Sequence, residues 1–344
     1  MGADVTHVAA DAVTFGGVIR EDVMNKIWDI SNIPLPFTEL CAKGTHTNKR
    51  VEFVTDELAA AATSNAVIEG ADITQSDGSL GARLGNFTQI AVKNVIITDT
   101  AEAANSIGGQ ASLSYQVKER QKELRRDVEA QMLTHQASVV GDASAAASVS
   151  AGIGAQIETN LEVGSGGSAG GFNTSTGVFD APTPGTKRAL TETLIRDVLQ
   201  AVYEAGGNTE CLMARPVVIR LLSTFLFGST ARVATLTSEK NQSSGNTPMT
   251  AYGSVNVFVT DFGQAVALKD NRLQAVDATA TSSMYFLDRS KLKQSFLRGY
   301  QVEPLAKTGL SEKRLMSVQY SLLVLNEKSQ GAIMAIDEAL AVTA

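Results

Sequence analysis

The sequence predicts an α+β fold for this chain of 344 residues. Two β-prone segments, 48–56 and 86–98, flank a long polar loop, and 109–139 carries a strong helical pattern. From residue 252 onward, short strands alternate with turns. Since the chain is longer than a typical single domain, we expect two lobes or one elongated molecule.

Composition and charge narrow the functional class. Hydrophobic residues make up 44% of the chain and charged residues 19%, which is ordinary for a globular protein. The formal net charge of −7 lacks the domain-wide basic footprint of a nucleic-acid binder. We expect no signal peptide and no membrane helix, because neither the N-terminus nor any apolar window has the required pattern. We therefore expect synthesis in a cytoplasm.

Residues 1–36 read as an extended arm. Isolated apolar residues such as Phe15 and Trp28 punctuate small and polar ones, and Pro34 and Pro36 end the segment. Such an arm would be stabilised by lying on a neighbouring subunit. The alternative is a terminus that docks on its own domain.

Residues 37–100 are predicted to form an extended loop built as a β-ribbon. The strand at 48–56 alternates, with Val51 and Phe53 on one face. The loop 57–85 is too long for a tight hairpin. A two-stranded ribbon is marginal alone, so we expect it to lie on a neighbour, with Phe53 and Phe87 as anchors.

The pattern at 109–139 predicts a long helix with a narrow apolar stripe, made of Leu113, Val117, Leu124, Val128 and Met132. About 30 residues would give a rod of ~45 Å. Ion pairs at i+3 or i+4 are expected between Glu119 and Lys122, Glu123 and Arg126, and Arg125 and Glu129. Because acids interleave with the bases, Lys122, Arg125, Arg126 and Glu129 suit contacts between subunits better than a phosphate track.

The second half of the chain mixes linkers, helices and strands. A small-residue linker at 141–151 and a Gly-rich loop at 164–177 come first. A helix opening at Leu190 or Thr191 should end at Gly206 and Gly207. A buried strand at 211–214 and a helix at 216–225 follow, and then strands at 255–260, 265–268, 284–287, 292–297, 302–306 and 315–326.

The sequence shows no pattern typical of catalysis or of a metal or cofactor site. The three histidines, His7, His46 and His135, and the two cysteines, Cys41 and Cys211, have no metal or redox spacing. The Gly-rich loop lacks the phosphate-binding pattern, and no Gly-x-Ser-x-Gly elbow occurs. We expect no cofactor and no enzymatic activity.

Several motifs, taken together in their order along the chain, resemble those of the major capsid proteins of tailed double-stranded DNA bacteriophages with the Hong Kong 97-type fold. The closing one is Tyr300-Gln-Val-Glu-Pro-Leu-Ala-Lys-Thr-Gly309, followed by an apolar strand. Earlier matches are Pro36-Phe-Thr, Asn65-Ala-Val-Ile-Glu-Gly70, Asn86-Phe-Thr-Gln-Ile, Tyr115-Gln-Val-Lys and Leu194-Ile-Arg-Asp-Val-Leu-Gln-Ala-Val-Tyr-Glu-Ala-Gly-Gly-Asn208. The resemblance covers nearly the whole chain.

The resemblance implies a domain plan. It consists of an N-terminal arm (1–36), an extended loop (37–100), a spine helix with part of the peripheral domain (101–145), an axial domain (146–290) and closing strands of the peripheral domain (291–344). It also implies self-assembly into hexamers and pentamers of an icosahedral shell that encloses double-stranded DNA without reading its sequence. The protein would thus be part of the virion, assembled in the bacterial cytoplasm.

Partners follow from the same resemblance. With no room for a cleavable scaffolding segment before the arm, a separate scaffolding protein is expected, together with a portal, and a cement protein is a candidate further partner. One family member cross-links its subunits through Lys and Asn; Lys93 and Asn94 are present here, but we expect no cross-link. We predict that Trp28→Ala lowers shell stability more than subunit folding, as melting and assembly assays would show; equal losses would contradict it.

Three other interpretations remain open. An encapsulin-like cargo shell would share the fold. An α+β enzyme or ligand-binding protein would need a convergent apolar pocket, which we would seek in 190–290. A tail-tube or decoration protein would have no need of the 109–139 rod.

Overall fold

The computed structural model describes residues 34–64, 66–72, 81–104, 112–142, 145–226, 257–276 and 281–339, with the backbone alone at 223–226 and 257–259. The chain divides into two units. The first contains residues 93–123 and 302–316, and the second contains 33–92, 124–301 and 317–344. The arm residues Phe15 and Trp28 lie outside the described residues.

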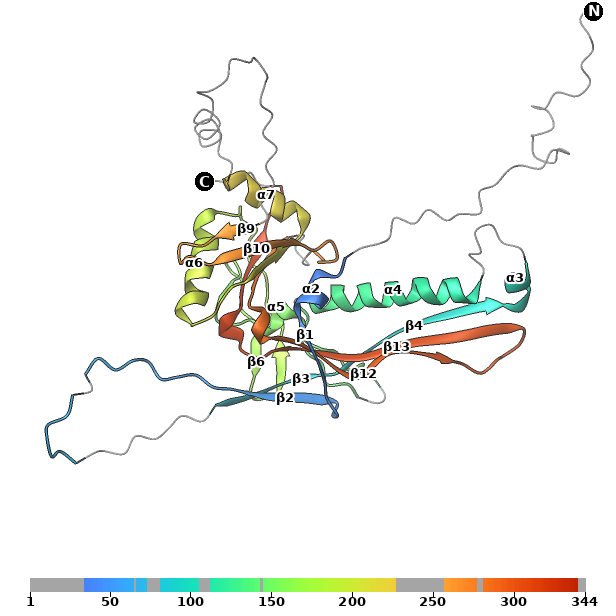
Figure 1. The fold of residues 1–344 in the computed structure, drawn as a ribbon, viewed down its shortest axis with the longest axis horizontal. Coiled ribbons are helices and arrows are strands. Elements are labelled where there is room, and N and C mark those ends of the chain that lie inside the picture. Colours follow the sequence, from blue (N-terminus) through green and yellow to red (C-terminus); the bar gives the residue numbers. More distant parts are fainter. Residues whose placement is uncertain are drawn as a thin grey trace, which may run out of the picture. The chain divides into compact units, whose positions relative to one another are not determined.

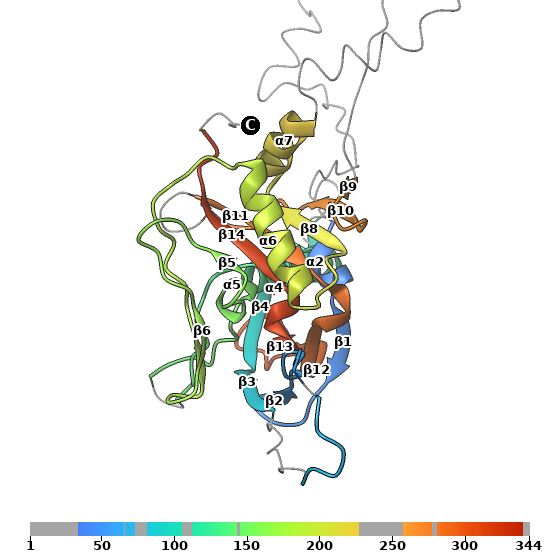
Figure 2. The ribbon, with the colours of Figure 1, turned by 90° about the vertical axis from the view of Figure 1, so that its left-hand side faces the viewer.

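A six-stranded sheet forms the centre of the second unit (Figures 1 and 2). Its strand order is β5-β14-β11-β8-β10-β9. The bounds are Leu161–Glu162 for β5, Cys211–Ala214 for β8, Val257–Val259 for β9, Ala265–Asp270 for β10, Ser282–Leu287 for β11 and Gly331–Ile336 for β14. Helices α6 (Glu192–Glu204) and α7 (Pro216–Leu226) share one core with the sheet, as Figure 2 shows for α6.

Local signals in the sequence explain where α6 begins and ends. The Thr191 hydroxyl accepts a hydrogen bond from Leu194 N at 3.3 Å, as an N-cap should. Gly206 takes a left-handed φ of +82°, a conformation that glycine adopts without strain and that commonly follows a helix. The predicted ends of α6 are therefore confirmed, and so are the strand β8 and the helix that opens at Pro216.

Strand β14 is absent from the sequence-based prediction, although all six of its residues are buried. It pairs antiparallel with β11, with Met284 opposite Ile333 and Tyr285 opposite Ala332. An uninterrupted apolar run has no period-two alternation, and only a short 3-10 turn, η3 (Glu327–Ser329), separates it from the strand before. Such a run is typical of a strand covered on both faces.

The ribbon is shorter than predicted and uses a different return strand. Strand β2 (Arg50–Thr55) pairs antiparallel with β3 (Ala82–Phe87), from Arg50 opposite Phe87 to Thr55 opposite Ala82. After Thr88, strand β4 (Gln89–Thr98) leaves the ribbon and joins a second sheet of order β1-β12-β13-β4. The prediction that 86–98 is one ribbon strand is therefore wrong.

The second sheet contains the closing strands. Strand β12 (Leu292–Pro304) merges the two segments predicted at 292–297 and 302–306, and β13 (Ser311–Val324) follows it. A short strand that the sequence did not predict, β1 (Ala42–Thr45), pairs parallel with β12. A 3-10 turn, η2 (Arg289–Lys291), leads from β11 into β12.

Helix α4 (Leu113–Met132) has 20 residues, about 30 Å at 1.5 Å per residue. Its last turns bury Leu124, Val128 and Met132, as the stripe predicted. It ends earlier than expected: the Thr134 hydroxyl donates to the Gln131 carbonyl at 2.7 Å, and Leu133 is already buried beyond the helix. A side chain bonded back to a carbonyl replaces the next turn of helix.

The predicted linker at 141–151 is partly a buried segment. Ser150 N donates to Gln89 Oε1 at 3.1 Å, and Ala151 N donates to Asn86 Oδ1 at 3.0 Å. The chain then forms the buried helix α5 (Ile153–Gln156). The Gly-rich loop contains a small hairpin, β6 (Gly171–Asn173) with β7 (Val178–Asp180).

The first unit is held by ion pairs near its turns. Helix α3 (Asp99–Ala103) is capped by the Thr98 hydroxyl, which accepts from Ala101 N at 3.3 Å. Lys307 Nζ lies 3.4 Å from Asp99 Oδ1 and 3.6 Å from Glu312 Oε1. The turn at the far end of β12 and β13 is thereby tied to α3.

Candidate functional site: the assembly surfaces

The ribbon and the loop after it expose large apolar side chains. Val54, Leu58, Val67 and Ile68 are 68%, 95%, 82% and 85% exposed. Single exposed apolar residues are normal on a surface, but four on one ribbon and its loop indicate a surface that another molecule covers. Sequence reasoning missed Leu58, Val67 and Ile68 because they are scattered in a loop whose composition is otherwise small and polar.

Charged side chains stabilise the ribbon itself. Glu52 on β2 contacts Arg83 on β3, and Arg50 Nε lies 3.4 Å from Glu52 Oε1. The hydrogen bond from Arg83 holds the pKa of Glu52 below its usual range. The Arg50 guanidinium also lies over the Phe87 ring, 5.5 Å from its centroid, within the range of a cation–π contact. These contacts link the two strands of the ribbon to each other, while Asn86 at the end of β3 donates to the Leu322 carbonyl at 2.6 Å.

The two predicted ribbon anchors differ in exposure. Phe53 is half-buried, so part of its ring is open to a partner. Phe87 is only 8% exposed, because it lies where the ribbon meets the second sheet. The expectation that Phe87 is an open anchor is corrected by this burial.

The charged residues of α4 pair differently from the prediction. Lys122 Nζ lies 2.8 Å from Glu119 Oε1, as expected. Glu123 instead meets Arg120 at 2.6 Å and Lys93 at 3.8 Å. Lys93, named above for a cross-link, thus lies beside an acid of its own chain.

The next turn of α4 departs further from the i+3 and i+4 scheme. The exposed Arg125 guanidinium lies over the Tyr300 ring, 5.4 Å from its centroid, and Arg126 is half-buried. Burial raises the pKa of Tyr300 to about 12, so its hydroxyl stays neutral beside this cation. The stacking partner on β12 is one that helix periodicity alone does not reveal.

Glu129 is corrected most strongly, because its side chain is 0% exposed. Its Oε1 accepts hydrogen bonds from Phe37 N and Asn271 Nδ2, each at 2.8 Å. Its Oε2 accepts from Thr38 N at 2.7 Å and from the Thr38 hydroxyl. A carboxylate satisfied by four donors of its own chain has no remaining capacity for a surface ion pair.

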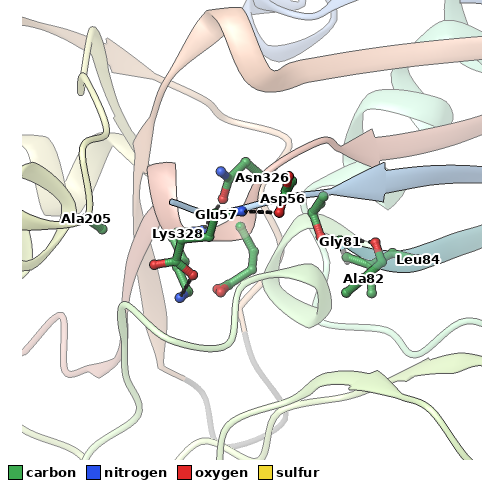
Figure 3. A pocket seen from close by; sticks show the side chains of 10 residues that line it. Asp56, Glu57, Gly81, Ala82, Leu84, Ala205, Asn326 and Lys328 are labelled. Atoms are coloured by element: carbon green, nitrogen blue, oxygen red, sulfur yellow. Dashed lines mark hydrogen bonds and ion pairs between the residues drawn. The ribbon is translucent and has the colours of Figure 1, made fainter. Parts of the chain in front are cut away.

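A groove of about 330 Å³ lies at the loop end of the ribbon, where β2 ends and β3 begins (Figure 3). It is lined by Thr55, Asp56, Glu57, Gly81, Ala82, Leu84, Ala205, Asn326, Glu327 and Lys328. Glu57 pairs with Lys328 across it, and Glu327 accepts from the Thr159 hydroxyl at 2.7 Å and from Thr159 N at 3.0 Å. These acids are engaged in holding loops together, and only Ala205 belongs to the 190–290 region, where a hidden ligand site was considered.

The described histidines and cysteines have structural contacts. The two ring nitrogens of His46 lie 2.8 Å from the hydroxyls of Ser295 and Thr88, and burial lowers its pKa. His135 Nε2 lies 2.9 Å from the Ser283 hydroxyl. Cys41 and Cys211 are buried free thiols. His7 lies outside the described residues.

Neither a metal-ligand cluster nor a membrane-spanning helix occurs among the described residues. In this part of the chain, no three His, Cys, Asp or Glu side chains are placed to hold a metal ion. Of the helices described, none combines the length and apolar character needed to span a membrane.

Solved structures with a similar fold identify the fold class of this chain. The chain resembles the capsid asymmetric unit of cyanophage A-1(L), with a TM-score of 0.58 and 13% identity, covering 92% of this chain and 97% of that one. It also resembles the SrpI encapsulin of Synechococcus elongatus, with a TM-score of 0.56 and 10% identity over 94% and 95% of the two chains. The predicted α+β fold of the Hong Kong 97 type is confirmed.

Sequence comparison gives the family. A model of the SU10 major capsid protein family matches residues 4–337, so the chain belongs to that family and is a tailed-phage major capsid protein. A curated relative, the major capsid protein of Escherichia phage Phieco32, is 25% identical over 328 residues, covering 87% of this chain and 89% of the relative. The family's role is structural, as a component of the virion capsid.

Proposed function

We propose that this protein self-assembles into hexamers and pentamers that close an icosahedral shell around phage double-stranded DNA. The family match across residues 4–337 carries the proposal. The net charge of −7 suits a container that does not adhere tightly to DNA, because phosphate binding needs a basic surface. The protein has no catalytic role in this scheme.

The exposed apolar side chains of the ribbon loop support the proposal physically. Leu58, Val67 and Ile68 expose most of their surface, and fully burying such a side chain is worth about 1.5–3 kcal/mol. A neighbouring copy that covers them would turn a weakly held loop into part of an interface. Shell strength is then the sum of many such contacts, repeated by symmetry.

The division of the chain belongs to the same proposal. In it, the arm (1–36) and the extended loop (37–100) reach neighbouring subunits, while 101–145 and 291–344 form the peripheral domain and 146–290 forms the axial domain. Phe15, Trp28, Phe53, Lys122, Arg125 and Arg126 remain the predicted subunit contacts. Assembly takes place in the bacterial cytoplasm with a separate scaffolding protein and a portal, and a cement protein is a candidate further partner.

Electron microscopy of the purified full chain, alone and with a candidate scaffolding protein, tests the proposal. Closed icosahedral particles, or free hexamers and pentamers by mass photometry, are expected. A small monomer or dimer under every condition would contradict it. Shells that take up a cargo protein but never DNA in infected cells would favour the encapsulin-like alternative.

A further inference from the structure

Helix α2 (Pro36–Leu40) is the first described element of the chain, and it lacks a cap of its own. The N-cap position holds Leu35, which makes no side-chain hydrogen bond to the helix. The first amides of any helix have no intrahelical partner, and a polar residue at the N-cap normally satisfies one of them. In α2, this leaves the Phe37 and Thr38 amides to be satisfied from elsewhere.

Glu129 supplies that cap from another helix, 92 residues away in the sequence. One carboxylate oxygen accepts from Phe37 N at 2.8 Å, and the other accepts from Thr38 N at 2.7 Å. Hydrogen bonds from backbone amides to an ionised carboxylate are stronger than those between neutral groups. The cap therefore holds α2 onto the last turns of α4.

The same carboxylate reaches a third segment. Asn271, which follows β10, donates to Glu129 Oε1 at 2.8 Å. Asn271 is itself buried at 1% exposure, and its Oδ1 accepts from Leu273 N at 2.9 Å. One buried group thus couples α2, α4 and the turn after β10.

A buried carboxylate is a costly way to cap a helix, because burying a charge is unfavourable unless it is fully bonded. Among the residues that the structure describes, no Lys, Arg or His forms an ion pair with Glu129. A Ser or Asp at position 35 would cap α2 locally without that cost. The long-range cap differs from a local one in that α2 gains its bonds only when it sits on α4.

The position of α2 on α4 affects the segments attached to both of its ends. Downstream, Cys41 leads directly into β1, whose register with β12 begins at Ala42 opposite Lys293. Upstream lies the predicted arm, whose residues 1–33 are outside the described part of the chain. We propose that Glu129 is the positioning residue of this junction: by capping α2 from α4, it fixes the point at which the predicted arm joins the second unit. The last part rests on the proposed shell function.

Hydrogen exchange on the full chain tests the positioning role. In Glu129→Gln, one carboxylate oxygen becomes an NH2 group, which cannot accept a hydrogen bond from whichever backbone amide, Phe37 N or Thr38 N, it faces. We expect exchange at Phe37 and Thr38 to rise about ten-fold or more, since a charge-assisted bond is lost. Peptides covering β8 and β11 should keep their protection.

Two matched variants grade the effect. Thr38→Val removes only the hydroxyl donor and should raise the exchange of the same peptide less than Glu129→Gln does. Glu119→Gln alters an acid on the outer part of the same helix, and should leave the peptide unchanged. A uniform rise across the second unit in Glu129→Gln, or no rise at Phe37 and Thr38, would overturn the proposal.

Assembly is read separately by electron microscopy. We expect Glu129→Gln to give folded subunits with a several-fold lower yield of shells, and Asp197→Asn, on the exposed side of α6, to give the wild-type yield. Normal shell yield from Glu129→Gln, despite a loosened α2, would overturn the link to the arm. If the wild-type chain itself forms no shells, the proposed function fails, while the exchange result still decides whether Glu129 positions α2.

Discussion

The six-stranded sheet with α6 and α7, called the body here, and the β2–β3 ribbon belong to the same unit. They differ in how far they bury their apolar side chains. In the body, α6 and α7 cover the sheet, and Leu212, Phe286 and Ile333 are fully buried. In the ribbon and its loop, Val54, Leu58, Val67 and Ile68 are largely exposed. Buried apolar area is the main source of folding free energy, so we expect the body to be stable alone and the ribbon to depend on what covers it.

This difference in burial explains how the chain can fold before it assembles. A subunit whose core is complete remains folded while its interaction surfaces are still open. A two-stranded ribbon is marginal in isolation, and here only its inner end, with Asn86 and Phe87, is buried. We therefore expect body variants to affect folding and ribbon variants to affect assembly.

The largest effect should come from the body. Phe286→Ala removes a fully buried ring from the core cluster and should lower the free energy of unfolding by about 3–5 kcal/mol. Chemical denaturation of the subunit measures it. Asp197→Asn, on the exposed side of α6, is the control and should change stability by no more than about 0.5 kcal/mol. Equal stability of the two variants would refute a self-sufficient body.

The next effect should appear only on assembly. The double variant Val67→Ser, Ile68→Ser should leave the free energy of unfolding within about 0.5 kcal/mol of wild type, because both side chains are exposed. Shell yield and shell melting temperature should fall, since each covered side chain is worth about 1.5–3 kcal/mol. Thr63→Ala in the same loop is the control. Wild-type shells from the double variant would show that no partner covers this loop.

Thiol chemistry provides a smaller, local contrast. Burial raises the pKa of Cys211 to about 11 and that of Cys41 further still. At pH 8 neither thiol should react with iodoacetamide until the subunit unfolds, because the thiolate is the nucleophile. An added thiol at the exposed position in Ala62→Cys should react within minutes in the free subunit. Rapid labelling of Cys211 in the native protein, measured by mass spectrometry, would mean that the body opens.

The smallest effect should come from the ion pair between Glu52 and Arg83, which bridges the two strands of the ribbon. Arg83→Ala removes the hydrogen bond that lowers the pKa of Glu52, so this pKa should rise toward the ordinary glutamate value. Since the folded pKa lies below the unfolded one, the pair stabilises the ribbon above the unfolded pKa of Glu52, and that contribution disappears as the pH falls through the folded pKa. NMR titration of the Glu52 carboxyl measures it. An unchanged pKa would mean that the two side chains do not interact in solution.

Short-range sequence signals predicted the helices of the body better than the pairing of strands that are distant in the chain. The Thr191 cap, Gly206 and Pro216 act within a few residues of themselves, so their outcomes could be read from the sequence. The parallel pairing of β1 with β12 and the return strand of the ribbon depend on residues far apart in the chain. Strand β14 was missed because an apolar run buried on both faces has no alternation.

At the candidate site, too, the sequence did not reveal contacts between distant segments. Helix periodicity places Glu129 one turn from Arg125, and an i+4 ion pair is the natural expectation. The structure instead gives each residue a partner from another element: Tyr300 for Arg125, and Phe37, Thr38 and Asn271 for Glu129. Spacing along one helix cannot indicate which neighbouring segment a side chain meets.

Hydrogen exchange compared between free subunits and assembled shells tests the central contrast most directly. We expect peptides from residues 56–72 to exchange within seconds in the subunit and to become protected in the shell. Peptides from β8, β11 and β14 should be protected equally in both. If 56–72 exchanged as fast in the shell as in the free subunit, the exposed apolar residues of the ribbon loop would have no partner, and the contrast between the two regions would fail.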